Sequence, residues 1–250
     1  MKYHFTEREL QKGLEPEQMG LEHISARTIE CMGEQTIETG KEEVCFVVVK
    51  GSLRFQCESE SGSSFEKDMI YVPRNKKISL SANKKSLVLR LGAPAHTDTN
   101  FEHISFQTVD EDPKKHVVVG RQENNSLRHV WNCIDDRFFA SRLMVGICQG
   151  SFGGWTAWPP HEHAKKREEV YYYINMNKNF GIQCVYETLD KPICLALVQE
   201  GDLISIPKGF HPNVGCPAGS ISYIYCMAAK QAGKRVFMDL RFQKEYGDRL

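Results

Sequence analysis

The stretch PPHEH, residues 159–163, places two histidines two positions apart. Because side chains alternate along a β-strand, His161 and His163 would point to the same side of a sheet. Two imidazoles on one side of a strand can donate to the same metal ion. The stretch therefore favours a β protein with a metal site built on its sheet.

Two further ligands lie downstream of this pair. A carboxylate follows at Glu168 or Glu169, and a third imidazole, His211, stands in the stretch PKGFHP, residues 207–212. Three imidazoles and a carboxylate can hold one divalent cation; imidazole suits zinc and iron, and the carboxylate also admits manganese. The predicted cofactor is a divalent metal ion, zinc first, with manganese or iron as alternatives. Such a site points to an enzyme.

Strand signals outnumber helix signals along the whole chain. Short β-branched or alternating segments are separated by Gly, Asn, Lys and Ser. In the first half they are 44–49, 53–57, 69–72, 78–81 and 86–91. In the second half they are 116–119, 127–133, 142–148, 170–174, 181–187, 193–198, 203–206 and 221–227. The sequence predicts an all-β protein with two barrels or sandwiches side by side.

The two halves are similar to each other in two places. GKEEVCFVVV at 40–49 is similar to REEVYYYI at 167–174, and KDMIYVPR at 67–74 is similar to GDLISIPK at 201–208. We interpret this similarity as the duplication of one unit. The competing interpretation is that any two β-hairpins with Asp and Pro at their turns look alike.

The duplication gives a division of the chain. We expect an N-terminal half at residues 1–96, a polar linker at 97–115 and a C-terminal half at 116–250. The first half has no HxH pair before Glu42 and no histidine shortly after Pro73. The metal site is therefore predicted in the C-terminal half alone, and the N-terminal half is expected to support the fold or an oligomer.

Composition limits the partners. The 32 basic and 32 acidic residues give a formal net charge of zero, so nothing favours a nucleic acid or an anionic membrane surface. No apolar run approaches the roughly 20 residues that span a bilayer, and the first residues do not resemble a signal peptide. The nine cysteines are scattered without a CxxC pair, which is typical of a reducing compartment. We expect a cytoplasmic protein that acts on a small molecule, with a homo-oligomer left open.

Four stretches resemble one group of enzymes. They are WPPHEH at 158–163, EEVYYY at 168–173, IPKGFHP at 206–212 and SYIYCMA at 222–228. They resemble cupin motifs and, more narrowly, those of the bicupin sugar isomerases. That family contains 5-deoxy-glucuronate isomerase of myo-inositol catabolism and 5-keto-4-deoxyuronate isomerase of pectin catabolism. The resemblance implies a duplicated cupin, with two jelly-roll β-barrels, that acts as a metal-dependent aldose-ketose isomerase of a deoxy-uronate sugar.

Details of the resemblance favour the inositol-pathway enzyme. One residue separates Gly209 from His211, which is the shorter spacing of that enzyme. Two features depart from it: the segment between His163 and Glu169 lacks its longer insertion, and the end of the chain, 234–250, lacks its tryptophan. The pectin-pathway isomerase stays the alternative.

The resemblance also selects residues. In the pectin-pathway isomerase the carboxylate ligand directly precedes the Val-Tyr strand, which favours Glu169 beside His161, His163 and His211. Isomerisation moves a proton between adjacent carbons, so its carrier must lie within reach of the substrate. The candidates for this role are Tyr171, Tyr173, Tyr223 and Glu168. The candidates for binding the sugar acid are Lys208, which would pair with its carboxylate, Trp158 and Tyr225.

Several of these candidate site residues could instead have a purely structural role. The tyrosines could be core or rim residues, and the run KKRE at 165–168 reads as a solvated turn. Two other functions would use the same ligands. A non-heme iron oxygenase of cupin type keeps positions open for substrate and oxygen, and would consume oxygen during turnover. A non-catalytic sugar-binding module would bind a sugar without forming product.

Overall fold

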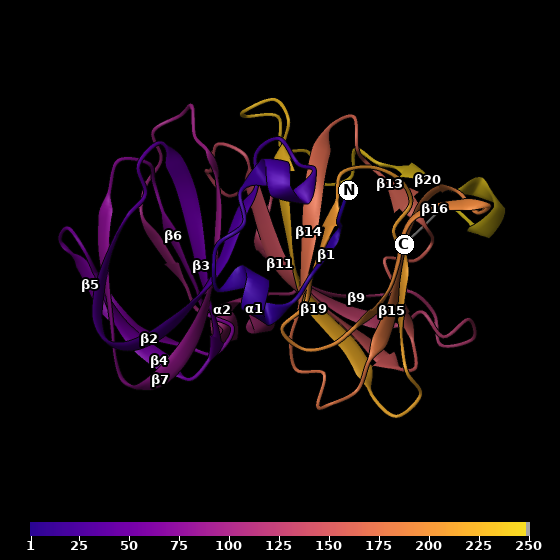
Figure 1. The fold of residues 1–250 in the computed structure, drawn as a ribbon, viewed down its shortest axis with the longest axis horizontal. Helices are drawn as coiled ribbons and strands as arrows, with labels where there is room; N and C mark the ends of the chain where they lie inside the picture. The colour runs from indigo at the N-terminus through magenta and orange to yellow at the C-terminus, as the bar shows by residue number, and fades with distance from the viewer. Residues whose placement is uncertain (249–250) are drawn as a thin grey trace.

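The computed structural model describes residues 1–248 as two β units that lie side by side (Figure 1). Helical elements are short: α1 (Glu7–Leu10), α2 (Phe106–Glu111) and the 3-10 turns η1 (Pro16–Met19) and η2 (Lys244–Tyr246). Across residues 1–248, none of the helices has the length and apolarity needed to cross a membrane. The prediction of an all-β protein is confirmed.

The N-terminal unit is one curled sheet in the order β5-β4-β7-β3-β6-β8, with β2 paired to β7. Its strands are β2 (Ser25–Glu38), β3 (Glu42–Lys50), β4 (Ser52–Cys57), β5 (Glu60–Phe65), β6 (Met69–Val72), β7 (Lys77–Pro94) and β8 (Glu102–Ile104). The sequence pattern missed β2, β5 and β8, the last within the stretch 97–115 that was expected to be a linker. It also divided β7 into two strands, because the polar stretch at 81–86 reads as a turn although the long strand runs through it.

The C-terminal unit has a seven-stranded sheet, β1-β17-β14-β19-β11-β10-β9, a four-stranded sheet, β12-β18-β15-β16, and the pair β13-β20. The first sheet uses β1 (His4–Phe5), β9 (His116–Val119), β10 (Arg128–Ile134), β11 (Leu143–Phe152), β14 (Arg167–Tyr173), β17 (Leu203–Ile206) and β19 (Ser220–Ala229). The others use β12 (Trp155–Thr156), β13 (His161–Glu162), β15 (Gly181–Thr188), β16 (Lys191–Val198), β18 (Asn213–Gly215) and β20 (Arg241–Phe242).

The start of the chain belongs to the seven-stranded sheet of the C-terminal unit. Strand β1 pairs with β17 in the register His4↔Ile204 and Phe5↔Leu203. In Figure 1 the indigo β1 accordingly lies among the orange and yellow strands of the C-terminal unit. The first residues therefore cross from their own half of the sequence to the other unit.

Alternation along β14 sorts its side chains between two environments. Val170 and Tyr172 belong to the apolar core that the two units share. Tyr171 and Tyr173 belong to the core inside the C-terminal unit. Glu169 shares the face of the latter pair, because residues two apart point to the same side of a strand. The fold thus turns Glu169 inward and Glu168 toward the other unit.

Two buried glutamates link the units reciprocally. The carboxylate of Glu168 accepts the backbone N–H groups of residues 22, 23 and 24 at 2.7–2.8 Å. The carboxylate of Glu43, on β3, accepts those of residues 141, 142 and 143 at 2.5–2.8 Å. A buried carboxylate is stable when its oxygens accept several hydrogen bonds. Each unit therefore holds a backbone segment of the other through hydrogen bonds to a buried carboxylate.

Strand register shows which positions of the two units correspond. Val72 pairs with Val44 on β3, and Ile206 pairs with Glu169 on β14. When Asp68–Pro73 is matched to Asp202–Pro207, Val44 corresponds to Glu169. Matching the two EEV motifs by sequence alone would be wrong by one residue.

Candidate metal centre

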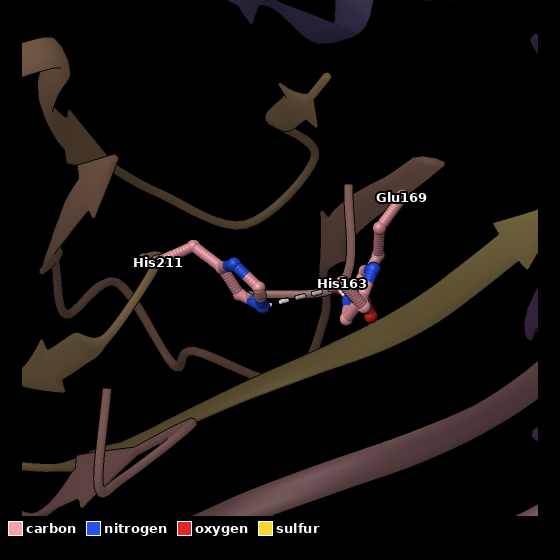
Figure 2. Close-up of side chains that lie close together, drawn as sticks. All are labelled: His163, Glu169 and His211. Carbon is pink, nitrogen blue, oxygen red and sulfur yellow. Dashed lines mark hydrogen bonds and ion pairs between the residues drawn. The ribbon is translucent and has the colours of Figure 1, made fainter. Parts of the chain in front are cut away.

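Three of the predicted ligands converge inside the C-terminal unit (Figure 2). The ligand atoms of His163, Glu169 and His211 all lie within 4.8 Å of one another, and all three residues are buried. Nε2 of His163 is 2.9 Å from Oε2 of Glu169, and Nε2 of His211 is 3.3 Å from the same oxygen. Glu169 comes from β14, His163 from the turn before it and His211 from the loop between β17 and β18.

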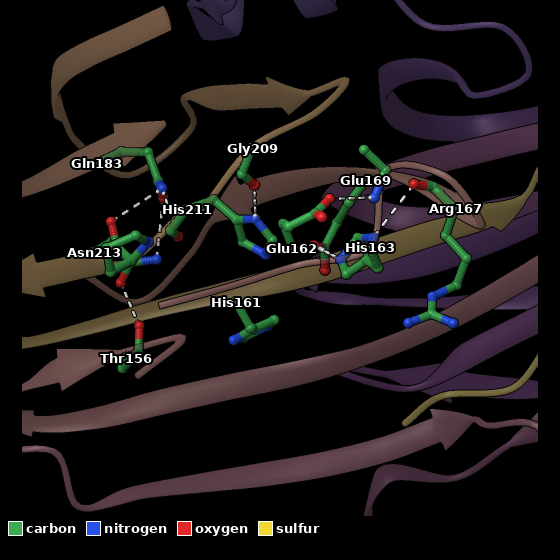
Figure 3. Close-up of polar contacts among 12 residues, drawn as sticks. Thr156, His161, Glu162, His163, Arg167, Glu169, Gln183, Gly209, His211 and Asn213 are labelled. Atoms are coloured by element: carbon green, nitrogen blue, oxygen red, sulfur yellow. Dashed lines mark hydrogen bonds and ion pairs between the residues drawn. The ribbon is translucent and has the colours of Figure 1, made fainter. Parts of the chain in front are cut away.

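The fourth predicted ligand lies beside this cluster. The ring centre of His161 is 4.8 Å from that of His211 and 6.3 Å from that of His163 (Figure 3). Its nitrogens are not part of the tight group of three. The structure therefore brings together three of the four residues and places His161 next to them.

Backbone carbonyls fix the orientation of all three imidazoles. Nδ1 of His161 lies 3.0 Å from the carbonyl oxygen of Pro159, Nδ1 of His163 lies 3.3 Å from that of Arg167, and Nδ1 of His211 lies 2.9 Å from that of Gly209. A carbonyl can only accept, so each Nδ1 carries the proton. Each Nε2 is then left with a lone pair, which is the arrangement of histidines that bind metal ions.

The donor set fits a divalent metal ion. Nε2 of His211 is buried and forms no hydrogen bond within residues 1–248, although it stands 3.3 Å from a Glu169 oxygen. Imidazole lone pairs that face an ionised carboxylate repel it. A cation between them would turn that repulsion into attraction and would satisfy the unpaired nitrogen.

Burial favours the neutral form of the histidines, which is the form that binds a metal ion. It lowers the pKa of His161 to about 3, and the neighbouring His211 and His163 add to the effect. Burial also lowers the pKa of His163. Metal ligands must be deprotonated in this way.

A cavity of 310 Å³ opens beside the ligands. Tyr171, Tyr223 and Tyr225 line it together with His161, His163 and Glu169. The hydroxyl of Tyr223 donates to Oγ1 of Thr156 at 3.0 Å, and that of Tyr225 donates to Oδ1 of Asn132 at 2.7 Å. These bonds hold two of the phenol groups in place at the cavity wall.

Tyr171 is the phenol with an unused hydroxyl. Within residues 1–248 it forms no hydrogen bond through its hydroxyl, and its ring centre is 6.0 Å from that of His211. Burial, and next the charge of Glu169, raise the pKa of Tyr171 well above its usual value. The hydroxyl is therefore protonated at neutral pH and can donate a hydrogen bond to a molecule in the cavity.

Besides the ligand His211, four of the predicted site residues lie outside the cavity lining. The hydroxyl of Tyr173 donates to Oε1 of Gln183 at 2.6 Å, farther inside the unit. The carboxylate of Glu168 faces the N-terminal segment. Nζ of the exposed Lys208 lies 2.6 Å from a carboxylate oxygen of Glu187. The Trp158 ring packs against Trp155 and Tyr246, with ring centres 5.1 and 5.4 Å away.

Sequence analysis missed two arginines of the cavity wall. Arg167 is only 1% exposed, whereas the run KKRE at 165–168 was expected to be a solvated turn. Arg128 is 3% exposed and lies on β10, where Arg128, Val130 and Asn132 all line the cavity. The signal for Arg128 was present in the stretch RHVWN at 128–132, because an arginine shares its face with an inward-facing valine.

A C-terminal segment, residues 235–243, closes one side of the cavity; we name it the strap. Phe237, Met238 and Leu240 of the strap line the cavity, and its strand β20 pairs with β13 through His161↔Phe242. The Arg167 guanidinium donates to carbonyl oxygens of the strap at Val236, Phe237 and Asp239. The strap is thus held by residues next to the ligands on both sides.

Comparison with solved structures shows the fold. An IolB-like protein from Salmonella typhimurium LT2 superposes with a TM-score of 0.82 at 21% identity, over 98% of both chains. Oxalate decarboxylase from Lactobacillus farciminis superposes with a TM-score of 0.66 at 11% identity, over 98% of this chain and 90% of that one. The predicted cupin-type fold is confirmed.

Sequence relatives share one name. The 5-deoxy-glucuronate isomerase of Shouchella clausii is 26% identical over 232 residues, 84% of this chain and 82% of that protein. The 5-deoxy-glucuronate isomerase of Halalkalibacterium halodurans is 29% identical over 227 residues, 81% of this chain and 80% of that protein. The model of the KduI/IolB family matches residues 2–244, almost the whole chain. The predicted family resemblance is confirmed, and the chain belongs to the KduI/IolB family.

Proposed function

We propose that this protein is a metal-dependent aldose-ketose isomerase of a deoxy-uronate sugar, with 5-deoxy-glucuronate as its substrate. The family and the common name of the relatives support an isomerase of this class of sugar. The observation that carries the metal dependence is the cluster of His163, Glu169 and His211 beside a cavity. The absence of disulfides among the nine cysteines supports a cytoplasmic location, where thiols stay reduced.

The metal would act as a Lewis acid toward the oxygens of the substrate. We propose zinc, with manganese or iron as alternatives, because nitrogen and carboxylate ligands suit all three. His163, Glu169 and His211 would hold the ion, and His161 lies close enough to be the fourth ligand. The carbonyls that fix the three Nδ1 atoms keep these ligands oriented before any ion arrives.

The protein's own groups would position the substrate and carry the proton. Tyr171 offers a protonated hydroxyl without an internal partner, so it can hold a proton at a substrate oxygen. Tyr223 and Tyr225 are already engaged with Thr156 and Asn132, and they fit a role as fixed walls of the site. Apolar side chains of the cavity would exclude water from the reacting carbons.

The two units would have different roles. We propose that the C-terminal half, within residues 116–250, binds the metal and that the N-terminal half, within 1–96, supports the fold, with 97–115 between them. Val44 occupies the position that corresponds to Glu169, and a valine has no atom that can bind a metal.

The test measures metal content and turnover on the same preparations. We expect about one zinc per chain, loss of isomerisation after chelation and its return when zinc is added. His211→Ala should lose both the metal and the activity, whereas His129→Ala, at an exposed position, is the matched control. Isomerisation at full rate in metal-free protein would refute the proposal.

The same assay separates the alternatives. NMR should show conversion of 5-deoxy-glucuronate at a higher kcat/KM than that of 5-keto-4-deoxyuronate. The reverse preference would favour the pectin-pathway reaction. Turnover that requires oxygen would favour an oxygenase, and binding of both sugars without product would favour a sugar-binding module.

A further inference from the structure

Two arginines line the cavity without an acidic partner. Arg128 and Arg167 are almost fully buried, and neither forms an ion pair with a carboxylate of residues 1–248. A buried charge is costly unless an opposite charge or several hydrogen bonds compensate it. A buried arginine in a cavity that has no carboxylate partner and keeps free N–H groups is therefore a candidate for binding an anionic ligand.

Arg167 already has partners. Its terminal nitrogens donate to the carbonyls of Val236, Phe237 and Asp239, at 3.0 and 3.1 Å for the last two. Glu169 lies two residues farther along the same face of β14. The negative charge of its carboxylate favours the charged form of the Arg167 guanidinium. The role of Arg167 is therefore to hold the strap beside the metal ligands.

Arg128 is fixed in place but keeps free donors. Nη1 donates to the carbonyl of Ser126 at 3.0 Å, and Nη2 donates to the carbonyl of Trp158 at 2.8 Å. A guanidinium has five N–H groups, so these bonds leave donors free on both terminal nitrogens. Gly120, at φ +88°, makes room for this arrangement: a Cβ there would lie 2.1 Å from the Ser126 oxygen and 3.0 Å from Nη1.

Arg128 lines the same cavity as the metal ligands His161, His163 and Glu169. Its anchor, the Trp158 carbonyl, is three residues before His161 in the same segment. On the cavity wall, burial raises the pKa of the Cys148 thiol, and the charge of Arg128 opposes that rise. A substrate whose reacting end meets the ligands would thus have a cation available within the same cavity.

We propose that Arg128 binds the carboxylate of the sugar acid and makes the site select acids over neutral sugars. The proposal rests on the function proposed above, and it replaces Lys208 in that role. Nζ of Lys208 is exposed and paired with Glu187, so it has an acidic partner already and does not line the cavity. Arg128 offers the planar fork that matches a carboxylate.

The experiment compares Arg128→Met and Arg128→Gln with Lys208→Met as the matched control. For 5-deoxy-glucuronate we expect kcat/KM to fall about 100-fold in both Arg128 variants, the usual scale for losing a buried charged contact. The control should stay within about twofold of the wild type, as surface substitutions usually do. Zinc content and circular dichroism should be unchanged in all three.

Binding of simple probes separates this inference from the proposed function. Calorimetry with the zinc-loaded protein should show that the wild type prefers D-glucuronate to D-glucose, and that the Arg128 variants lose this preference. If the wild type has no isomerase activity, the proposed function fails, but the two probes still test Arg128. A preference that survives in folded Arg128→Met, or one that disappears in Lys208→Met, would overturn the inference.

Arg128→Lys covers the case in which the other variants do not fold. It keeps the buried charge but cannot offer two parallel N–H groups, so we expect D-glucuronate to bind about tenfold more weakly. Affinity equal to that of the wild type would contradict a forked contact.

Discussion

The two units share a strand framework and differ in what fills it. Inside the N-terminal unit, Val44, Phe46 and Val48 project from β3 into an apolar core. At the corresponding positions of β14 stand Glu169, Tyr171 and Tyr173. The inward-facing residues of this one strand therefore determine whether the interior of a unit is a packed apolar core or a metal site with a cavity.

The outward faces show the opposite behaviour. Glu43 and Glu168 occupy corresponding positions, and each binds three consecutive backbone N–H groups of the other unit. Positions that join the units are thus alike, whereas positions that face the interior differ. This contrast can be tested by changing one face at a time.

The largest effect is expected when Glu169 becomes the residue found in the other unit. Glu169→Val should abolish zinc binding and lower kcat by at least about 10³-fold, because the ion that stabilises charge in the transition state is lost. Metal analysis and steady-state kinetics measure this result, with Glu187→Val at the exposed Lys208 contact as control. A Glu169→Val protein that keeps its zinc would break the comparison.

The two joining glutamates should matter about equally for stability. Glu43→Ala and Glu168→Ala each leave three N–H groups without their acceptor, so we expect each to lower the free energy of unfolding by about 3 kcal/mol. Urea unfolding measures the loss, and exposed Glu17→Ala is the control.

Kinetics on Glu168→Gln tests the alternative role of this residue. The folded variant should keep most of its kcat, because the carboxylate faces the N-terminal segment and not the cavity. A collapse of kcat in well-folded Glu168→Gln would restore the carboxylate as a candidate proton carrier.

Substitutions of the tyrosines on β14 should distinguish the cavity from the core. Tyr171→Phe removes the unused hydroxyl of the cavity, and we expect kcat to fall about 100-fold, the lower end for general acid-base groups. Tyr173→Phe removes the bond to Gln183 and should cost about 1 kcal/mol of stability, with little change in kcat. Tyr172→Phe, on the opposite face, is the control. Equal losses of kcat in Tyr171→Phe and Tyr173→Phe would contradict the division between cavity and core.

Much of the fold could be predicted because strands carry local signals. The segments around β3, β14, β17 and β19 were found from alternation and β-branched residues alone. The residues of the metal cluster could also be found from short-range patterns, an HxH pair and a later histidine in a turn, although only His161 of the pair lies on a strand. These features depend on neighbours in the sequence.

The rest depends on which strands pair and in which register. Glu168 is adjacent to Glu169 in the sequence, yet alternation turns it to the other side, where residues 22–24 meet it. Lys208 is close to His211 in the sequence, but its side chain extends to the surface. Alternation places Arg128 on the same face of β10 as Val130, but the position of that face at the cavity depends on the pairing of β10 with β9 and β11.

The pairing of β1 with β17 has a consequence for synthesis and for dissection of the chain. The partner of His4 and Phe5 is made some 200 residues later, so the edge of the metal-binding sheet can be completed only after β17 has been synthesised. A fragment that begins after the N-terminal unit would leave β17 as an open, apolar edge, which invites aggregation. A minimal metal-binding fragment should therefore also include residues 1–6, so that β1 can pair with β17.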